Sequence, residues 1–429
     1  MTYSILAVKR LLQRNDALLK HGAIVVTAGL LCNVLNYCYQ LAMGRMLGPA
    51  DFGVLGALTS LATVFAVPAE TIRTLLMKFT SKTVAAGRSE GLGYAIRHLT
   101  LRVVIVSGIG LFGLLAASGG IGHLLRLTNV APALILGPLF FLQLLSPALE
   151  GSLSGLQRFA RLGAAQTVAY VAKLASGIAL VAVGFSVTGA LAAVAVGAGV
   201  SLLVSTCFLR DVLWQRSSSR DVQGVSTYSL YAFLAFLFLA LLNNLDVILV
   251  RRLFTDSVAA GHYVAAMTVA RAVYFGAISI VAVMFPKVAA LVSSGKGAGS
   301  ERLLRDTLIY VGLLAGLGAL GLNLFPGFVV SVFFGGAYSE SAGLVGLMSI
   351  GMLFRSLSYT IVLYDLARER TESVLVLAVG VLGEGIGIAL LHGSLRGVAA
   401  VVTAMWAGVG VCMGALLVAR RSVIAGRQQ

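Results

Sequence analysis

Residues 22–46 read GAIVVTAGLLCNVLNYCYQLAMGRM, and no Asp, Glu, Lys or Arg occurs in this stretch before Arg45. An α-helix rises about 1.5 Å per residue, so such a run is long enough to cross the roughly 30 Å hydrocarbon core of a bilayer. Similar runs recur along the chain of 429 residues, of which 59% are apolar and only 11% are charged. So little polar surface does not coat a soluble protein of this length. We therefore expect an all-α polytopic membrane protein.

Apolar windows of about 20 residues predict about twelve transmembrane helices. They cover residues 22–46, 52–78, 100–120, 130–153, 163–184, 187–209, 226–250, 259–286, 303–325, 342–366, 373–392 and 397–419. The charged N-terminal segment shows no signal-peptide pattern, so we expect the first window to remain as a membrane helix. The four cysteines lie in apolar runs without CxxC or Cys/His spacing. We therefore expect no disulfide, metal site or cofactor.

Lys and Arg residues are distributed unequally between the two ends of these helices. If both termini and the even-numbered connections share one side, the other side receives only Arg45, Arg126, Arg251, Arg252 and Arg396. Lys and Arg concentrate in the cytoplasmic loops of membrane proteins, so we expect both termini to be cytoplasmic. The net charge of +16 follows mostly from this bias and from attraction to anionic lipid, so no nucleic-acid partner is expected.

The two halves of the chain contain an internal repeat. Leu35-Asn36, Arg45 and Gly53 recur at a nearly constant offset as Leu242-Asn243, Arg252 and Gly261. Six predicted spans per half enter the membrane from the same side, which gives a parallel repeat about an axis along the membrane normal. We expect an N-terminal bundle at residues 1–213, a cytoplasmic linker at 214–225 and a C-terminal bundle at 226–429, with a shared cavity between the bundles.

Polar side chains occur at helical spacing inside several predicted spans. Those with amide or phenol groups are Asn33, Asn36 and Gln40 in the first span, Tyr170 in the fifth, Asn243 in the seventh, Tyr263 in the eighth and Tyr359 in the tenth. Span four carries Gln143, Ser146, Pro147 and Glu150 on one face. Such residues either hydrogen-bond neighbouring helices together or line a polar cavity. The sequence leaves both interpretations open.

Four basic residues also fall inside predicted spans. Lys173, Arg271 and Arg355 each lie about ten or more residues from a span end, near the bilayer midplane. A charge at that depth costs at least about 2.5 kcal/mol, so these residues are candidates for a wet, cationic cavity. Arg73 joins them as a weaker candidate because an acidic residue precedes it by one turn.

Glu70, Asp246 and Glu384 are acidic groups inside spans. Buried carboxyl groups can exchange protons during transport, so all three are candidates for ion coupling. They have an alternative role as static partners. Glu70 is three residues before Arg73 on the same helix face, and Asp246 or Glu384 can pair with Arg355.

The segment Leu47-Gly48-Pro49 followed by Asp51 and Gly53 lies in the predicted turn between the first two spans. Gly48-Pro49 favours a tight turn, Asp51 can cap the following helix, and Gly53 allows close helix packing. We therefore interpret this motif as structural, without a direct part in substrate binding.

The longer segment Tyr39–Gly56, YQLAMGRMLGPADFGVLG, resembles the opening of bacterial polysaccharide-biosynthesis membrane proteins. Pro68-Ala69-Glu70-Thr71 and the second-half repeat through Arg252 and Gly261-His262-Tyr263 add to this resemblance. Those proteins are the O-antigen and exopolysaccharide flippases of the multidrug/oligosaccharidyl-lipid/polysaccharide transporter superfamily. The resemblance covers essentially the whole chain, through its predicted twelve spans in two halves.

The resemblance implies a MATE-like fold and a transporter with no enzymatic activity. Its cargo would be an undecaprenyl-pyrophosphate-linked oligosaccharide, moved across the bacterial inner membrane by alternating access. Membrane lipids and the glycan polymerase and glycosyltransferases of the same pathway would be its partners. Lys173, Arg271, Arg355 and Arg73 would then bind the diphosphate, and the amide and phenol side chains would contact the sugars.

Four other functions stay open at this point. A multidrug exporter of the same superfamily binds organic cations, which buried positive charges disfavour. Peptidoglycan-precursor flippases show a fourteen-span pattern. A membrane glycosyltransferase or polymerase usually has a long outer loop with a catalytic acid, whereas the outer connections here are short and contain no Asp-x-Asp pair. A purely structural role as a membrane scaffold would account for the hydrophobic composition but not for the cations near the midplane.

Overall fold

A computed structural model of the chain describes residues 2–85, 92–214, 227–293, 297–368 and 370–426. Within these residues the elements are all helical: α1 (Thr2–Phe65), α2 (Val67–Ala85), α3 (Leu92–Leu124), α4 (Ala131–Gly155), α5 (Phe159–Ala182), α6 (Ser186–Leu213), α7 (Thr227–Leu242), α8 (Leu245–Leu253), α9 (Ser257–Ser293), α10 (Gly297–Leu324), α11 (Pro326–Phe334), η1 (Gly336–Ser341), α12 (Ala342–Ala367), α13 (Glu372–Leu391) and α14 (Leu395–Gly426). Each of the twelve predicted spans falls on one of these helices or on an adjacent pair. The expected all-α membrane fold is confirmed.

Length and hydropathy alone identify fewer spans than twelve. Nine of the described helices qualify, or ten if α7 and α8 form one bent span. The second predicted span is not counted, because α1 counts once although its backbone breaks at Gly48 with φ 72° and ψ 173°, and because charged residues lower the hydropathy of α2. The eighth predicted span is not counted either, since α9 is not among the qualifying helices. The segments on either side of Gly48 correspond to the first span and the beginning of the second.

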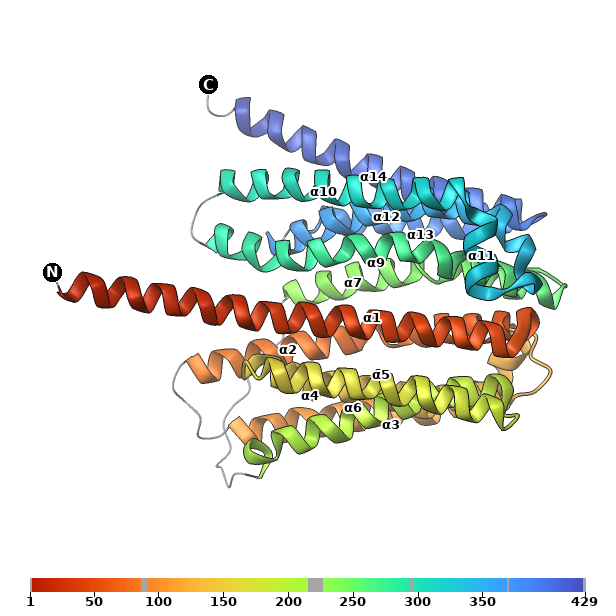
Figure 1. Ribbon diagram of the computed structural model, residues 1–429, viewed down its shortest axis with the longest axis horizontal. Helices are drawn as coiled ribbons and strands as arrows, with labels where there is room; N and C mark the ends of the chain where they lie inside the picture. Colours follow the sequence, from red (N-terminus) through yellow and green to blue (C-terminus); the bar gives the residue numbers. More distant parts are fainter. Residues whose placement is uncertain (1, 86–91, 215–226, 294–296, 369, 427–429) are drawn as a thin grey trace.

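The helices form two groups that lie side by side along the long axis of the molecule. Figure 1 shows α2 to α6 on one side of α1 and α7 to α14 on the other, with α1 packed against α9 between them. The beginning of α1 and the end of α14 lie at the same end of the bundle (Figure 1), as an even number of passes requires. We call α1–α6 the N-terminal half and α7–α14 the C-terminal half. The predicted linker at 214–225 lies outside the described residues except for Trp214.

The repeat-related glycines Gly53 and Gly261 meet where the two halves touch. A Cβ atom on Gly53 would lie 2.7 Å from the backbone nitrogen of Gly261, and one on Gly261 would clash with the carbonyl oxygen of Pro49. Residues near a twofold axis contact their own equivalents, so this pairing agrees with the parallel repeat. The predicted close packing at Gly53 is confirmed. Asp51 accepts a hydrogen bond from the hydroxyl of Ser186, a contact that the motif did not predict.

The outer helices of both halves expose continuous apolar stripes. On α3 the side chains of Ile109 and Phe112 are 70% and 71% exposed, and Leu375 and Leu390 on α13 show similar values of 70% and 76%. A soluble protein rarely exposes such contiguous apolar surface. These stripes face the lipid, which leaves the polar side chains of the spans on the inside.

The seventh span, predicted as one helix over residues 226–250, is broken. Helices α7 and α8 meet at an angle of 40°, and the turn between them contains Asn243 and Asn244. The side-chain amide of Asn244 donates back to the carbonyl oxygen of Ala240 at 2.8 Å. Asn side chains compete in this way for backbone groups that a regular helix would use. The prediction of a continuous span is therefore wrong at this point.

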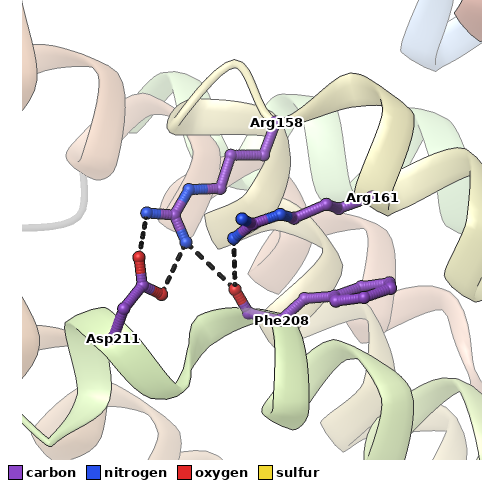
Figure 2. A network of polar contacts seen from close by, with 4 residues as sticks. All are labelled: Arg158, Arg161, Phe208 and Asp211. Carbon is purple, nitrogen blue, oxygen red and sulfur yellow. Dashed lines mark hydrogen bonds and ion pairs between the residues drawn. The ribbon is translucent and has the colours of Figure 1, made fainter.

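A polar brace holds the ends of α5 and α6 together in the N-terminal half (Figure 2). Arg158 Nη1 donates to Asp211 Oδ1 at 2.7 Å and to the carbonyl oxygen of Phe208 at 3.0 Å, and Arg161 Nη1 donates to the same carbonyl oxygen at 3.1 Å. Two guanidinium groups from the start of α5 thus bind one carbonyl oxygen in the last two turns of α6. The Asp211 side chain is 51% exposed, so the ion pair itself contributes at most about 1 kcal/mol.

Candidate functional site

The break between α7 and α8 places a carboxyl group at a helix start deep in the C-terminal half. Asp246 lies in the first turn of α8 and is 1% exposed. Its Oδ1 accepts the backbone N–H of Val247 at 2.8 Å, and its Oδ2 accepts the hydroxyl of Tyr263 at 2.8 Å. Negative charge is favourable at a helix N-terminus. The broken span therefore presents an acidic group to the interior of the bundle.

Arg271 on α9 lies beside the same break. Its Nη2 donates to the backbone carbonyl oxygen of Asn243 at 2.7 Å, a group that the end of α7 leaves without a helical partner. Arg271 Nε and Asn243 Oδ1 are buried and have no hydrogen-bond partner among the described residues. Asp246 interacts with Arg271 electrostatically. This part of the cluster keeps unused hydrogen-bonding capacity, which a ligand can fill.

Arg355 on α12 belongs to the same cluster and is 7% exposed. Its guanidinium carbon lies 3.8 Å from the ring centroid of Tyr274, whose ring meets the Tyr359 ring edge to face at 5.7 Å. The predicted partners Asp246 and Glu384 do not reach it within 4.0 Å in the described part of the chain. Stacking on Tyr274 therefore replaces the direct ion pair that the sequence offered as the alternative.

Glu384 on α13 is the most deeply buried acid of the cluster, with no exposed surface. Neither carboxyl oxygen has a side-chain hydrogen-bond partner among the described residues, and the carboxyl group interacts with the charge and the backbone of Asp246. A buried carboxylate with so few donors is costly, so this group is a candidate for binding a proton or a cation.

In the N-terminal half, Lys173 on α5 reaches toward α1. Its Nζ donates to Asn36 Oδ1 at 2.8 Å and lies 4.2 Å from the ring centroid of Tyr39 and 5.8 Å from that of Tyr170. No described carboxylate lies within 4.0 Å of this amine. The amide and aromatic partners stabilise the ammonium group without neutralising it.

Lys173 lines a polar cavity of about 310 Å³ between α2, α4, α5 and α6. Its polar lining residues are Glu70, Arg73, Gln143, Ser146, Glu150, Gln166, Tyr170, Lys173 and Ser201. Glu150 is the one acid here that the sequence analysis placed on a polar face without assigning it a role. Its Oε1 accepts the hydroxyl of Ser201 at 2.6 Å, and its Oε2 accepts the amide of Gln166 at 2.8 Å.

Glu70 and Arg73 on α2 form an ion pair at 3.6 Å, as the alternative interpretation predicted. Their side chains are 56% and 34% exposed, so the pair faces a wet space and is not buried. Glu70 interacts electrostatically with Tyr170 of the N-terminal half and with Tyr359 of the C-terminal half. The pair thus lies where the cavity of the N-terminal half faces the other half.

The structure divides the predicted cations between two places. Lys173 and Arg73 lie at the cavity of the N-terminal half, whereas Arg271 and Arg355 lie in the cluster of the C-terminal half. Two carboxyl groups accompany each pair, so both places hold mixed charge. Among the predicted sugar contacts, Asn33 is exposed on α1, Gln40 is half-buried, and Tyr263 is fully buried with its hydroxyl on Asp246.

The end of the bundle that contains Gly48 is closed by contacts between the halves. Arg45 Nε donates to the carbonyl oxygen of Phe333 at 2.9 Å, and its Nη2 donates to that of Val332. Tyr338 donates its hydroxyl to the carbonyl oxygen of Gly44 at 2.6 Å. Helices α11 and η1, which the sequence analysis left as an outer connection, provide the partners from the C-terminal half.

A second set of contacts closes the same end. Arg251 on α8 donates from Nε to the carbonyl oxygen of Leu125 at 3.0 Å and from Nη2 to that of Arg126 at 3.1 Å. Together with the packing of Gly53 on Gly261, these bonds join the two halves at this end.

Comparison with known proteins gives one family and one fold. The family model described as polysaccharide biosynthesis protein matches residues 42–343. No curated protein sequence matches the chain.

Solved structures share the fold at low sequence identity. An inward-facing multidrug resistance MATE family transporter of the MOP superfamily gives a TM-score of 0.73 at 13% identity, covering 95% of this chain and 99% of that chain. Its outward-facing counterpart gives 0.66 at 15%, covering 96% of each. A MOP superfamily transporter from Pyrococcus furiosus, noted for the reverse polarity of its binding pocket, gives 0.63 at 13% and also covers 96% of each. The chain therefore has the MATE fold.

Proposed function

Because the chain belongs to the polysaccharide biosynthesis protein family, we propose that it moves an undecaprenyl-diphosphate-linked oligosaccharide across the bacterial inner membrane. The halves would alternate between opening to one side and opening to the other, as expected for a fold built from two packed bundles. The glycan-assembling enzymes of the same pathway would supply and consume this lipid. The proposal makes the protein a transporter with no chemical step of its own.

The observation that carries the proposal is a set of cations inside spans that no carboxylate neutralises directly. Lys173, Arg271 and Arg355 have no ion pair within 4.0 Å among the described residues. Charges at this depth are costly and need a function. A diphosphate suits them, because Arg binds phosphate oxygens through two parallel donors and Lys binds them as a point charge. Arg73 would join them on release from Glu70.

The polar groups around these cations suit the sugars of the same cargo. Asn36, Gln40 and Tyr170 in one half and Asn243 and Tyr359 in the other provide amide and phenol groups near the interior. Sugars offer hydroxyl groups that both donate and accept, which such side chains match. Asn33 is already exposed on α1, whereas Tyr263 would take part only after a conformational change exposes it. The lipid tail would stay in the bilayer.

We assign ion coupling to the acids of the interior, with Glu384 and Asp246 as the principal pair. They lie in one half beside Arg271, so a proton or cation bound there would change the field at the cation that holds the cargo. Glu70 would act at the mouth of the other cavity, where its pair with Arg73 competes with the diphosphate.

Both termini should be cytoplasmic, which would make the closed end periplasmic. The reason is the concentration of Lys and Arg on the side that holds the termini. Reporter domains fused after Trp214 and after Gln429 should both show cytoplasmic activity, whereas a fusion after Asn129 should show periplasmic activity. A periplasmic signal at either of the first two positions would overturn this orientation.

Vesicles that contain the purified protein and the lipid-linked oligosaccharide of its source cells test the transport itself. The fraction of sugar that a membrane-impermeant lectin reaches should rise at least about tenfold faster than in protein-free vesicles, because the polar head does not cross a bilayer unaided. Ethidium serves as the comparison cargo for a multidrug exporter. Movement of ethidium without movement of the glycan lipid would favour that alternative.

A further inference from the structure

The cavity of the N-terminal half contains more hydrogen-bond acceptors than binding of a diphosphate requires. Glu150 projects into it from α4, and each of its two oxygens accepts one hydrogen bond from the protein, from Ser201 and from Gln166. A carboxyl group offers about four lone-pair positions, so part of its capacity is unused. Gln143 lies on the same helix face, and its buried Oε1 has no partner in the described part of the chain.

Helix α5 contributes a donor to the same cavity. Lys173 Nζ makes its one hydrogen bond to Asn36 at 2.8 Å and has three protons to donate. The Tyr170 ring lies next to this amine at 5.8 Å from its centroid. Acceptors on α4, a donor on α5 and the aromatic ring of Tyr170 line one cavity. Together they match a sugar ring, whose hydroxyl groups donate and accept and whose C–H face is apolar.

Size and charge agree with a single sugar residue. A volume of about 310 Å³ lies at the lower end of the roughly 300–1,000 Å³ typical of small-molecule pockets, so a complete oligosaccharide does not fit. Arg73 and Lys173 share this lining with Glu70 and Glu150, so the cations can hold a phosphate group while the acids face the uncharged sugar next to it.

We propose that this cavity is a sugar subsite in which Glu150 and Gln143 accept hydrogen bonds from one residue of the transported glycan. The inference rests on the proposed function and adds the residue that recognises the sugar. Glu150 would select residues with neighbouring hydroxyl or N-acylamino groups, because two donors at adjacent positions reach both carboxyl oxygens. The cations would hold the diphosphate independently of this selection.

The test compares two probes on the full-length protein in lipid nanodiscs. One is undecaprenyl diphosphate without sugar, and the other is the lipid-linked oligosaccharide extracted from the source cells. The wild-type protein should bind the sugar-bearing lipid about tenfold or more tightly than the bare one, since hydrogen bonds to a charged group account for such a factor. Glu150→Gln should remove most of this difference and leave the affinity for undecaprenyl diphosphate unchanged.

The unchanged affinity for the bare lipid shows that the variant is folded. If Glu150→Gln lowers both affinities, Ser201→Ala provides the second variant, because it removes one bond that orients Glu150 and retains the carboxyl group. Glu340→Gln, with a side chain 81% exposed at the closed end, is the matched control. Equal binding of both probes by wild type, or a full difference in Glu150→Gln and Ser201→Ala, would refute the subsite. Binding of neither probe by wild type would instead refute the proposed function.

Discussion

Cells that carry Arg271→Gln or Arg355→Gln in place of the wild-type protein should lose their surface polysaccharide while the protein remains in the membrane at normal abundance. Gln retains length and hydrogen-bonding capacity but removes the charge that the diphosphate needs. Loss of a buried charge-assisted contact costs about 2–5 kcal/mol, which corresponds to a decrease of about thirtyfold or more in cargo binding. Staining of surface polysaccharide and immunoblots of membranes provide the two measurements.

Replacement by Lys distinguishes the expected roles of Arg271 and Arg355. Arg271→Lys should retain part of the activity, because a single donor can still reach the carbonyl oxygen of Asn243, now 2.7 Å from Nη2. Arg355→Lys should be nearly inactive, since an ammonium group does not reproduce the planar stack on Tyr274 at 3.8 Å. Arg210 is exposed at the end of α6, and Arg210→Gln should be silent. Normal polysaccharide in both Gln variants would show that these arginines have only an internal structural role.

The helical architecture could be predicted because lipid imposes length and hydropathy on every span. Residues 22–46 and the other eleven predicted spans have the required length and apolar character, and the positions of the described helices agree with them. The repeat was also predictable, since Gly53 and Gly261 must both be small to pack at the interface between the halves. These features depend on local composition, which a single sequence contains.

The break at Asn243 and Asn244 was harder to predict, because neither proline nor glycine marks it. Asn residues in a span usually bond to a neighbouring helix, whereas here Asn244 bonds within its own turn to Ala240. The sequence signal for the break was the pair Asn243-Asn244, which Asp246 follows within three residues. A helix start inside the membrane attracts an acid by its dipole, so the order Asn-Asn-Leu-Asp could have indicated a new N-terminus.

The division of the cations could not be predicted from spacing along single helices. Lys173 and Arg271 lie at similar depths in their spans, yet one bonds Asn36 of α1 and the other bonds Asn243 of the broken span. Which helices face each other is a property of packing, and one sequence does not contain it. Glu150 was placed on a polar face without a role for the same reason, because its partners Gln166 and Ser201 come from two other helices.

The second large effect is expected at Glu384, the buried acid for which no described side chain provides a hydrogen bond. Glu384→Gln should abolish gradient-driven transport of the lipid-linked oligosaccharide in vesicles, while the protein still binds that lipid with an affinity that no longer depends on the coupling ion. Gln has the same shape but binds neither a proton nor a cation, so the cluster with Asp246 and Arg271 would stay fixed in one charge state. The protein should be as stable as wild type, because no direct ion pair is lost.

The assay imposes a proton gradient and a sodium gradient separately on the vesicles, so that it also identifies the coupling ion. Glu340→Gln makes the same chemical change on an exposed side chain and should transport normally. If Glu384 has only a static role, the opposite result is expected. Transport in Glu384→Gln would continue with its full gradient dependence, and thermal stability would decrease, because Arg271 or Arg355 would lose a buried acidic partner. The two roles therefore differ in both measurements. A carboxyl group that couples must be able to change its charge, whereas one that only stabilises must keep it.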